Sequence, residues 1–234
     1  MTEQTRFPDN LKPTPILDWE TAPLRAVATD IRGSHADDRA FLQAAHAHLA
    51  RSVHPIYSLD ELQPASVTLQ KRRGSCSQRM ACLEATARAA HIPTRVRALR
   101  VSGQFWYPRF RAVMLFLPKQ ILLLWPQFFV DNAWGDAEEI YAPLPQLAQA
   151  AQHGFRNDGE SVFDAIEHTP IDFFAKTCGV GCSASKFDLS RFVLADEGFF
   201  ASRDDAFQRL GLLQNTLRGR AFEILFGGKK SREQ

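Results

Sequence analysis

The chain has 234 residues, of which 45% are hydrophobic and 23% are charged, and its formal net charge is +2. A chain of this length can bury a sizeable core, and its composition is ordinary for a globular protein. The small net charge gives no reason to expect nucleic-acid binding. Its 4 cysteines are too few for a disulfide scaffold, and its polar, proline-broken start lacks the apolar segment of a secretory leader. We therefore expect a protein of a reducing, cytoplasmic compartment.

The sequence divides into four stretches. Residues 1–20 are polar and interrupted by prolines, which predicts a flexible N-terminal arm. Residues 21–142 combine helical and strand patterns and are expected to form the core. Residues 143–226 predict a mainly helical extension packed on that core, and residues 227–234 form a basic tail.

Residues 37–52 predict the first clear helix. Behind an acidic first turn, apolar residues recur at the spacing of one helix face: Phe41, Leu42, Ala45 and Leu49. His46 and His48 lie two positions apart and face different ways, which argues against a metal-binding pair. Residues 59–70 predict a short helical or looped segment.

A second helix is predicted from Cys76 to about residue 90. Ser75 is a good N-cap, and Gly74 allows a tight entry to the helix. Cys76 then lies in the first turn, where the helix dipole and the basic residues 71–73 favour a thiolate. This placement is typical of cysteine nucleophiles, although most free cysteines are small packed core residues.

Three strands are expected next: residues 94–101, 110–117 and 121–130. The apolar stretch from residue 113 to 125 is interrupted by Pro118, Lys119 and Gln120. It therefore predicts two buried strands joined by a turn, and not a membrane span. We predict an α+β fold in which N-terminal helices and the helix after Cys76 pack on an antiparallel sheet, with a mostly helical C-terminal part.

These elements resemble the transglutaminase-like superfamily, which has the papain-like cysteine fold, over about residues 55–135. The family's pattern is Gly-x-Cys, an alanine- and leucine-rich helix, Gly-Ile-Pro-Ala-Arg and a strand. Here Gly74-Ser75-Cys76 opens the helix, and 91-HIPTR-95 follows it. His91 replaces the glycine, which is tolerable because histidine visits left-handed conformations more readily than most residues. The family's aspartate follows a strand and an aromatic residue, as Asp131 does in 125-WPQFFVDNAW-134.

The resemblance implies a catalytic site made of Cys76 and Asp131, but the strand that should carry the family's histidine has none. Arg111 stands about where that histidine is expected, and Arg111 or Arg109 should lie between Cys76 and Asp131 in one cleft. Arginine cannot act as a general base because its pKa stays above about 12, but it can hold a thiolate or a carboxylate. Three alternatives stay open: another histidine completes the site, Cys76 works without a base, or the site has lost its chemistry.

Other candidate residues surround this predicted site. Gln70 precedes Cys76 by six residues, the spacing at which papain-like enzymes carry an oxyanion-stabilising glutamine. Trp106, Arg109 and Trp134 are the expected substrate-binding residues, although core packing accounts for most aromatic side chains. None of the remaining histidines that we considered stands where a base is needed: His54, His91, His153 and His168.

Two classes of function stay open. The first is a cysteine-dependent enzyme that performs acyl transfer or amide-bond hydrolysis of peptidase type through a Cys76 thioester. The second is a catalytically degenerate binding or scaffold protein with the same fold. Residues 71–73 with Arg79 suit an acidic partner: a peptide, a protein or a carrier-bound acyl substrate. Cys178 and Cys182 lack a second pair or a histidine at ligand spacing, so neither a metal nor a cofactor is expected, and neither is a nucleic-acid or membrane partner.

Overall fold

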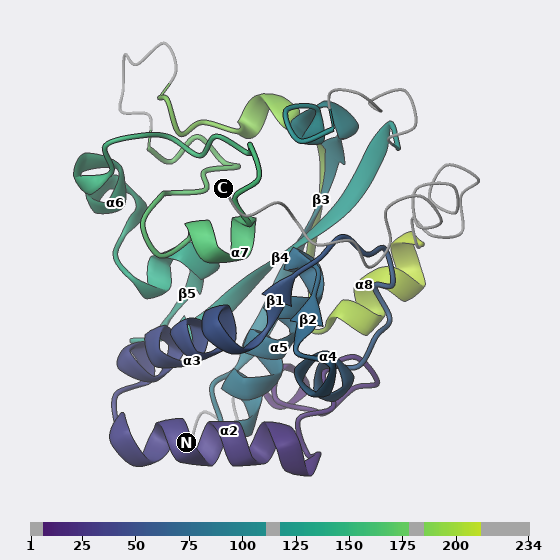
Figure 1. The fold of residues 1–234 in the computed structure, drawn as a ribbon, viewed down its shortest axis with the longest axis vertical. Helices are drawn as coiled ribbons and strands as arrows, with labels where there is room; N and C mark the ends of the chain where they lie inside the picture. The colour runs from purple at the N-terminus through teal and green to yellow at the C-terminus, as the bar shows by residue number, and fades with distance from the viewer. Residues whose placement is uncertain (1–6, 111–117, 178–184, 212–234) are drawn as a thin grey trace.

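The computed structural model describes residues 7–110, 118–177 and 185–211, and it shows helices packed on one face of an antiparallel sheet (Figure 1). The first half of the chain supplies the main helices: α2 (Ala22–Ser34), α3 (Asp38–Ser52), α4 (Ala65–Lys71) and α5 (Cys76–Ala89). The predicted helices at 37–52 and 76–90 are therefore confirmed. Asp37 caps α3 by accepting a hydrogen bond from the backbone of Ala40.

Helix α5 is the central helix of the fold. It contacts α2, α3, α4 and the sheet, and every residue from Gln78 to Arg88 is buried. Burial on all sides requires its charged side chains to have partners inside the protein. Glu84 supplies an example, because its carboxylate is 2.6 Å from the Nε of Arg203, and both side chains are buried.

Four strands form the main sheet of the described residues, in the order β5-β4-β3-β6. They are β3 (Thr94–Ser102), β4 (Gln120–Val130), β5 (Ala133–Asp136) and β6 (Val193–Phe200). All neighbouring strands are antiparallel, and the pairing of β3 with β4 runs from Thr94 opposite Phe128 to Ser102 opposite Gln120. The predicted strands at 94–101 and 121–130 are confirmed. Residues 111–117 of the strand predicted at 110–117 lie outside the described residues, and Phe110 lies in a turn.

Shorter elements connect these layers. Two residue pairs form a parallel bridge between β1 (His54–Pro55) and β2 (Arg73–Gly74). The other helical elements are η1 (Pro8–Asn10), η2 (Gly103–Trp106), η4 (Ala137–Ile140), α6 (Leu144–Ala150), α7 (Val162–Ala165), η5 (Ser190–Phe192) and α8 (Arg203–Leu210). No helix within the described ranges is long and apolar enough to cross a membrane.

Two parts of the chain differ from the sequence prediction. Residues 7–20 are not a flexible arm, because Ile16 and Leu17 are buried in the core and Thr14 hydrogen-bonds to Asp204 over 2.5 Å. The sequence predicts an arm because Ile16 and Leu17 are surrounded by polar residues and prolines. In the C-terminal part, β6 adds a strand where the sequence predicts mostly helices, and this strand joins the core sheet through β3.

Candidate functional site

Cys76 occupies the first position of α5, as predicted. The Ser75 hydroxyl accepts a hydrogen bond from the Gln78 backbone, and the Gln78 side chain accepts one from the Ser75 backbone. This reciprocal cap satisfies amide groups that the first helical turn leaves free. Gly74 is required at the entry because a Cβ there would lie 2.7 Å from Thr68 Cγ2. The sequence therefore fixes both the start of the helix and the position of the thiol.

Cys76 lines a pocket of about 140 Å³ with mostly apolar walls. Trp106 and Arg109, two of the predicted substrate-binding residues, line the same pocket, although their role stays a prediction. Apolar side chains from several segments complete the wall: Tyr57, Leu59, Phe105, Phe110, Leu123 and Phe173. Arg109 is held in place by its Nε, which donates to Asn157 Oδ1 over 2.7 Å. The pocket suits an apolar group presented to a thiol.

Ser161 is the polar neighbour of the Cys76 thiol in the described residues, with 3.3 Å between Sγ and Oγ. Arg79 Nη1 donates to Ser161 Oγ over 3.1 Å, so the hydroxyl hydrogen is available to the sulfur. Arg79 is itself buried and forms two hydrogen bonds with Asp164, of 2.9 and 2.6 Å. This Arg79–Asp164 pair fixes the hydroxyl beside the thiol.

Sequence reasoning missed both Ser161 and Asp164. They lie on or just before α7, and each contacts a residue of α5 that precedes it by 85 positions, Cys76 for Ser161 and Arg79 for Asp164. Local motifs do not report on such distant pairing. The one available signal was Arg79 itself, because an arginine in the interior of a buried helix requires an acidic partner elsewhere in the chain.

No histidine lines the Cys76 pocket, although all 7 histidines of the chain lie within the described residues. His153 is exposed and therefore does not complete the site. His46 is buried on α3, where its Nε2 is 2.6 Å from the Phe163 carbonyl oxygen and its Nδ1 is 2.7 Å from the Tyr141 hydroxyl. Burial lowers the pKa of His46, which favours the neutral ring that these contacts use. Its role is structural.

Asp131 does not share a cleft with Cys76, and that prediction is wrong. It lies in the turn between β4 and β5, where its carboxylate is 2.8 Å from Nη2 of Arg39. With Trp134 it lines a separate pocket of about 250 Å³. The cause is the sheet register: β3 starts after the C-terminal end of α5, and the antiparallel β4 ends beside the start of β3. A helix of 14 residues, about 20 Å long, spans the distance back to Cys76.

Two other predicted site residues, Gln70 and Arg111, are not found beside Cys76 among the described residues. Gln70 is exposed on α4 and is not among the described residues that line the Cys76 pocket, so the predicted oxyanion role has no support in the geometry. The glutamine that does lie near Cys76 is Gln78, whose side chain caps the helix. Arg111, the predicted replacement for histidine, lies outside the described residues.

Glu138, which sequence reasoning passed over, is the carboxyl group linked to the pocket wall. Trp125 lines the pocket, and its indole nitrogen donates to Glu138 Oε2 over 3.0 Å. Burial and, next, the charge of Asp136 raise the pKa of Glu138 well above its usual value, which favours the protonated acid. The sequence feature that could have drawn attention to Glu138 is the group of acidic residues that follows Trp134.

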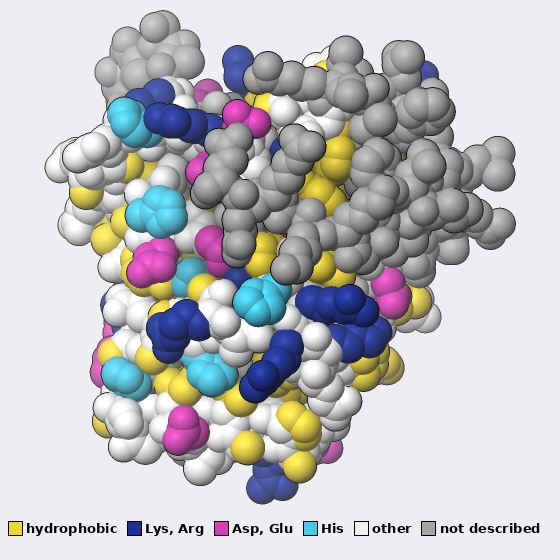
Figure 2. All heavy atoms as spheres, viewed as in Figure 1, with side chains coloured by type: hydrophobic (Ala, Val, Ile, Leu, Met, Phe, Trp, Pro, Cys, Tyr) yellow, Lys and Arg dark blue, Asp and Glu magenta, His cyan; other side chains and the backbone are white. Residues whose placement is uncertain are grey.

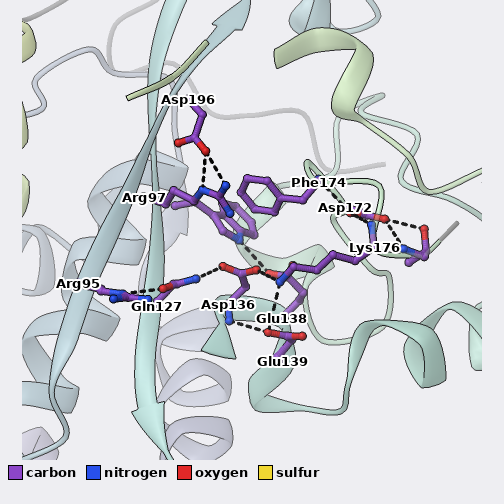
Figure 3. Close-up of polar contacts among 12 residues, drawn as sticks. Arg95, Arg97, Gln127, Asp136, Glu138, Glu139, Asp172, Phe174, Lys176 and Asp196 are labelled. Carbon is purple, nitrogen blue, oxygen red and sulfur yellow. Dashed lines mark hydrogen bonds and ion pairs between the residues drawn. The ribbon is translucent and has the colours of Figure 1, made fainter. Parts of the chain in front are cut away.

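Asp136 is a buried carboxyl neighbour of Glu138, and Figure 3 shows its contacts. One of its oxygens accepts from the Gln127 amide over 2.7 Å, and the other is 2.5 Å from Lys176 Nζ. Interaction with Asp136 raises the pKa of Lys176 although burial opposes this. The buried negative charge is thus compensated locally and is not free to act on the thiol.

A cysteine at the start of a helix that packs on an antiparallel sheet is the arrangement expected of the papain-like class of cysteine folds. Residues 25–138 match the model of the transglutaminase-like superfamily. A crystal structure described as a "putative cysteine protease" from Cytophaga hutchinsonii is similar to this chain with a TM-score of 0.49 and 12% identity. The match covers 86% of this chain and 49% of that one, so the chain spans about half the length of the matched protein. No curated protein matches the sequence.

Proposed function

We propose that this chain is a transglutaminase-like binding protein that takes an apolar group into the Cys76 pocket without histidine-assisted catalysis. The observation that carries the proposal is the composition of the pocket wall: a thiol and apolar side chains, with none of the chain's 7 histidines. A general base must lie within hydrogen-bond reach of the proton that it removes. The partner found at that distance is a serine held by an arginine.

The size of the pocket indicates the kind of group it accepts. Its volume of about 140 Å³ is close to that of an engineered apolar cavity, about 150 Å³, that binds benzene. One aromatic ring or a branched aliphatic group of similar volume therefore fits. Burying such a group gives roughly 25 cal/mol per Å² of apolar area, which supports weak binding on its own and tighter binding with further contacts.

Binding of fluorotoluene, followed by fluorine NMR, tests this proposal directly. We expect saturable binding that Leu123→Trp abolishes, because the larger ring fills the pocket. The matched control is Leu194→Trp, which makes the same replacement at an exposed position on β6 and should leave binding unchanged. Binding that survives Leu123→Trp, or no binding to the parent protein, contradicts the proposal.

A second candidate function is acyl transfer or amide hydrolysis through a Cys76 thioester. The position of Cys76 favours it, since a partly exposed thiol at a capped helix start faces the pocket. Turnover on a panel of small thioesters and amides, lost in Cys76→Ala and kept in Cys82→Ala, would establish this function. Cys82 is the suitable control because it is fully buried, and burial raises its pKa to about 12.

A further inference from the structure

A cluster of basic side chains lies on the surface beside the pocket. Arg51 lies in the last turn of α3, Lys71 is the last residue of α4, and Arg72 follows it as the C-cap. The β1–β2 bridge places His54 opposite Arg73, and the His54 backbone donates to the Arg72 carbonyl over 2.9 Å. All five side chains are exposed, and Figure 2 shows Lys and Arg side chains gathered on this face over α3, β1 and β2. We refer to Arg51, His54, Lys71, Arg72 and Arg73 as the basic patch.

The charges of the basic patch have no acidic partner among the described residues. The side chains of Arg51, Arg72 and Arg73 form neither a hydrogen bond nor an ion pair there, and Lys71 donates to the neutral amide of Gln63 over 2.5 Å. Arg79, which the sequence grouped with these residues, is excluded because it is buried against Asp164. The patch therefore carries four uncompensated positive charges.

Two residues of the basic patch, His54 and Arg73, lie on short strands whose chains continue to the pocket. From His54 in β1 the chain continues to Tyr57, and from Arg73 in β2 it continues to Cys76; both end points line the pocket. Each step covers three residues, at most about 10 Å of extended chain. A bound molecule could thus contact the patch and the pocket together.

We infer that the site binds an acidic peptide segment of a partner protein, whose aromatic or large aliphatic side chain enters the pocket while nearby Asp or Glu side chains contact the basic patch. This inference rests on the proposed function of the pocket. Guanidinium groups match carboxylates in a bidentate geometry, and unpaired arginines lose no existing ion pair on binding. The distance between patch and pocket places the acidic residues about three positions from the apolar one, at about 3.3 Å per extended residue.

Fluorescence polarisation of a labelled peptide tests the inference. The peptide carries a central phenylalanine and two aspartates, one three positions before it and one three positions after it. Parallel peptides carry asparagine for aspartate or alanine for phenylalanine. We expect the acidic phenylalanine peptide to bind at least tenfold more tightly than either, with an affinity that falls as salt is added. The double variant Arg72→Ala/Arg73→Ala should weaken it tenfold or more. The matched control Arg25→Ala/Arg191→Ala removes two exposed charges elsewhere and should change affinity less than twofold.

The outcomes separate this inference from the proposed function. Fluorotoluene binding without a preference for the acidic peptide overturns the inference alone, whereas absence of fluorotoluene binding overturns the proposed function. Equal weakening by the two double variants also overturns the inference, because net charge and not the patch would then explain it. Competition by inorganic tripolyphosphate at lower concentrations than by unlabelled peptide overturns it as well, since the patch would then select phosphate.

Discussion

The two residues that the family resemblance pairs, Cys76 and Asp131, line pockets at opposite ends of strand β4, and the two ends differ in chemistry. At one end Cys76 lines an apolar pocket beside Ser161. At the other end Asp131 forms a partly exposed ion pair with Arg39 and lines a different pocket. The fold thus places the thiol at the start of a helix, and no histidine is among the described residues that line its pocket. The predictions below test how independent the two ends are.

The largest expected effect is a loss of stability when the buried Arg79–Asp164 pair is broken, in contrast to the exposed Arg39–Asp131 pair. Arg79 is fully buried against Asp164, so Asp164→Ala leaves an unpaired buried charge and should lower the free energy of unfolding by about 3–5 kcal/mol. Urea denaturation followed by circular dichroism measures this loss. Asp164→Ala should also slow alkylation of Cys76, because Ser161 loses the arginine that positions it. A loss below about 1 kcal/mol would show that Arg79 finds another partner.

A gain of chemistry is the next expected effect. The family's histidine opens the strand before the aspartate. In the structure the strand that directly precedes Asp131 is β4, and its residue Leu123 lines the pocket. Leu123→His should therefore raise hydrolysis of a small thioester at least tenfold, toward the 10²–10⁴-fold range of general bases. The gain should vanish in the double variant with Cys76→Ala. Leu194→His, at the exposed site on β6, is the control and should produce no gain.

The pH dependence of stability provides a third, smaller test. Burial raises the pKa of Glu138, so its contribution to stability is complete below the usual value near 4.5 and is lost as pH rises through the raised pKa. Glu138→Gln keeps an acceptor for Trp125 but cannot ionise. Its free energy of unfolding should therefore improve relative to the parent between about pH 5 and pH 8. Glu167→Gln, at an exposed position, should show no such trend.

The smallest effect is expected at the Asp131 end. Asp131→Asn removes a partly exposed ion pair with Arg39 and should change the free energy of unfolding by less than about 1 kcal/mol. Fluorotoluene binding and Cys76 alkylation should stay at parent levels. Loss of either property would connect the two ends and revive the paired-site interpretation.

Local features of the fold could be predicted from the sequence because short-range physics determines them. The cap at Ser75, the start of α5 and the strand pattern after Thr94 all depend on neighbouring residues. His91 also adopts the left-handed conformation expected of it, with φ of 64°. The position of Cys76 at the start of α5 could be predicted for the same reason.

Long-range features could not be predicted in this way. Ser161 reaches Cys76 from 85 residues away, and no motif near either residue announces the contact. Asp131 satisfied a local pattern, but the antiparallel register of β4 carries it to the wrong end of α5. Burial and register, which depend on the whole fold, decide such assignments.

The pairing of β6 with β3 has a consequence for how the protein is made. The region that matches the family ends at residue 138, but β3 receives its second neighbour from β6, and Glu84 in α5 receives its cation from Arg203. In a nascent chain that has emerged only to residue 138, Glu84 lacks the arginine that pairs with it in the folded core. Strand β3 likewise has one edge unpaired. The ribosome must therefore synthesise the chain beyond residue 203 before the core can close. Folding of the family-matched part is completed late in synthesis, and a fragment cut at residue 138 should aggregate.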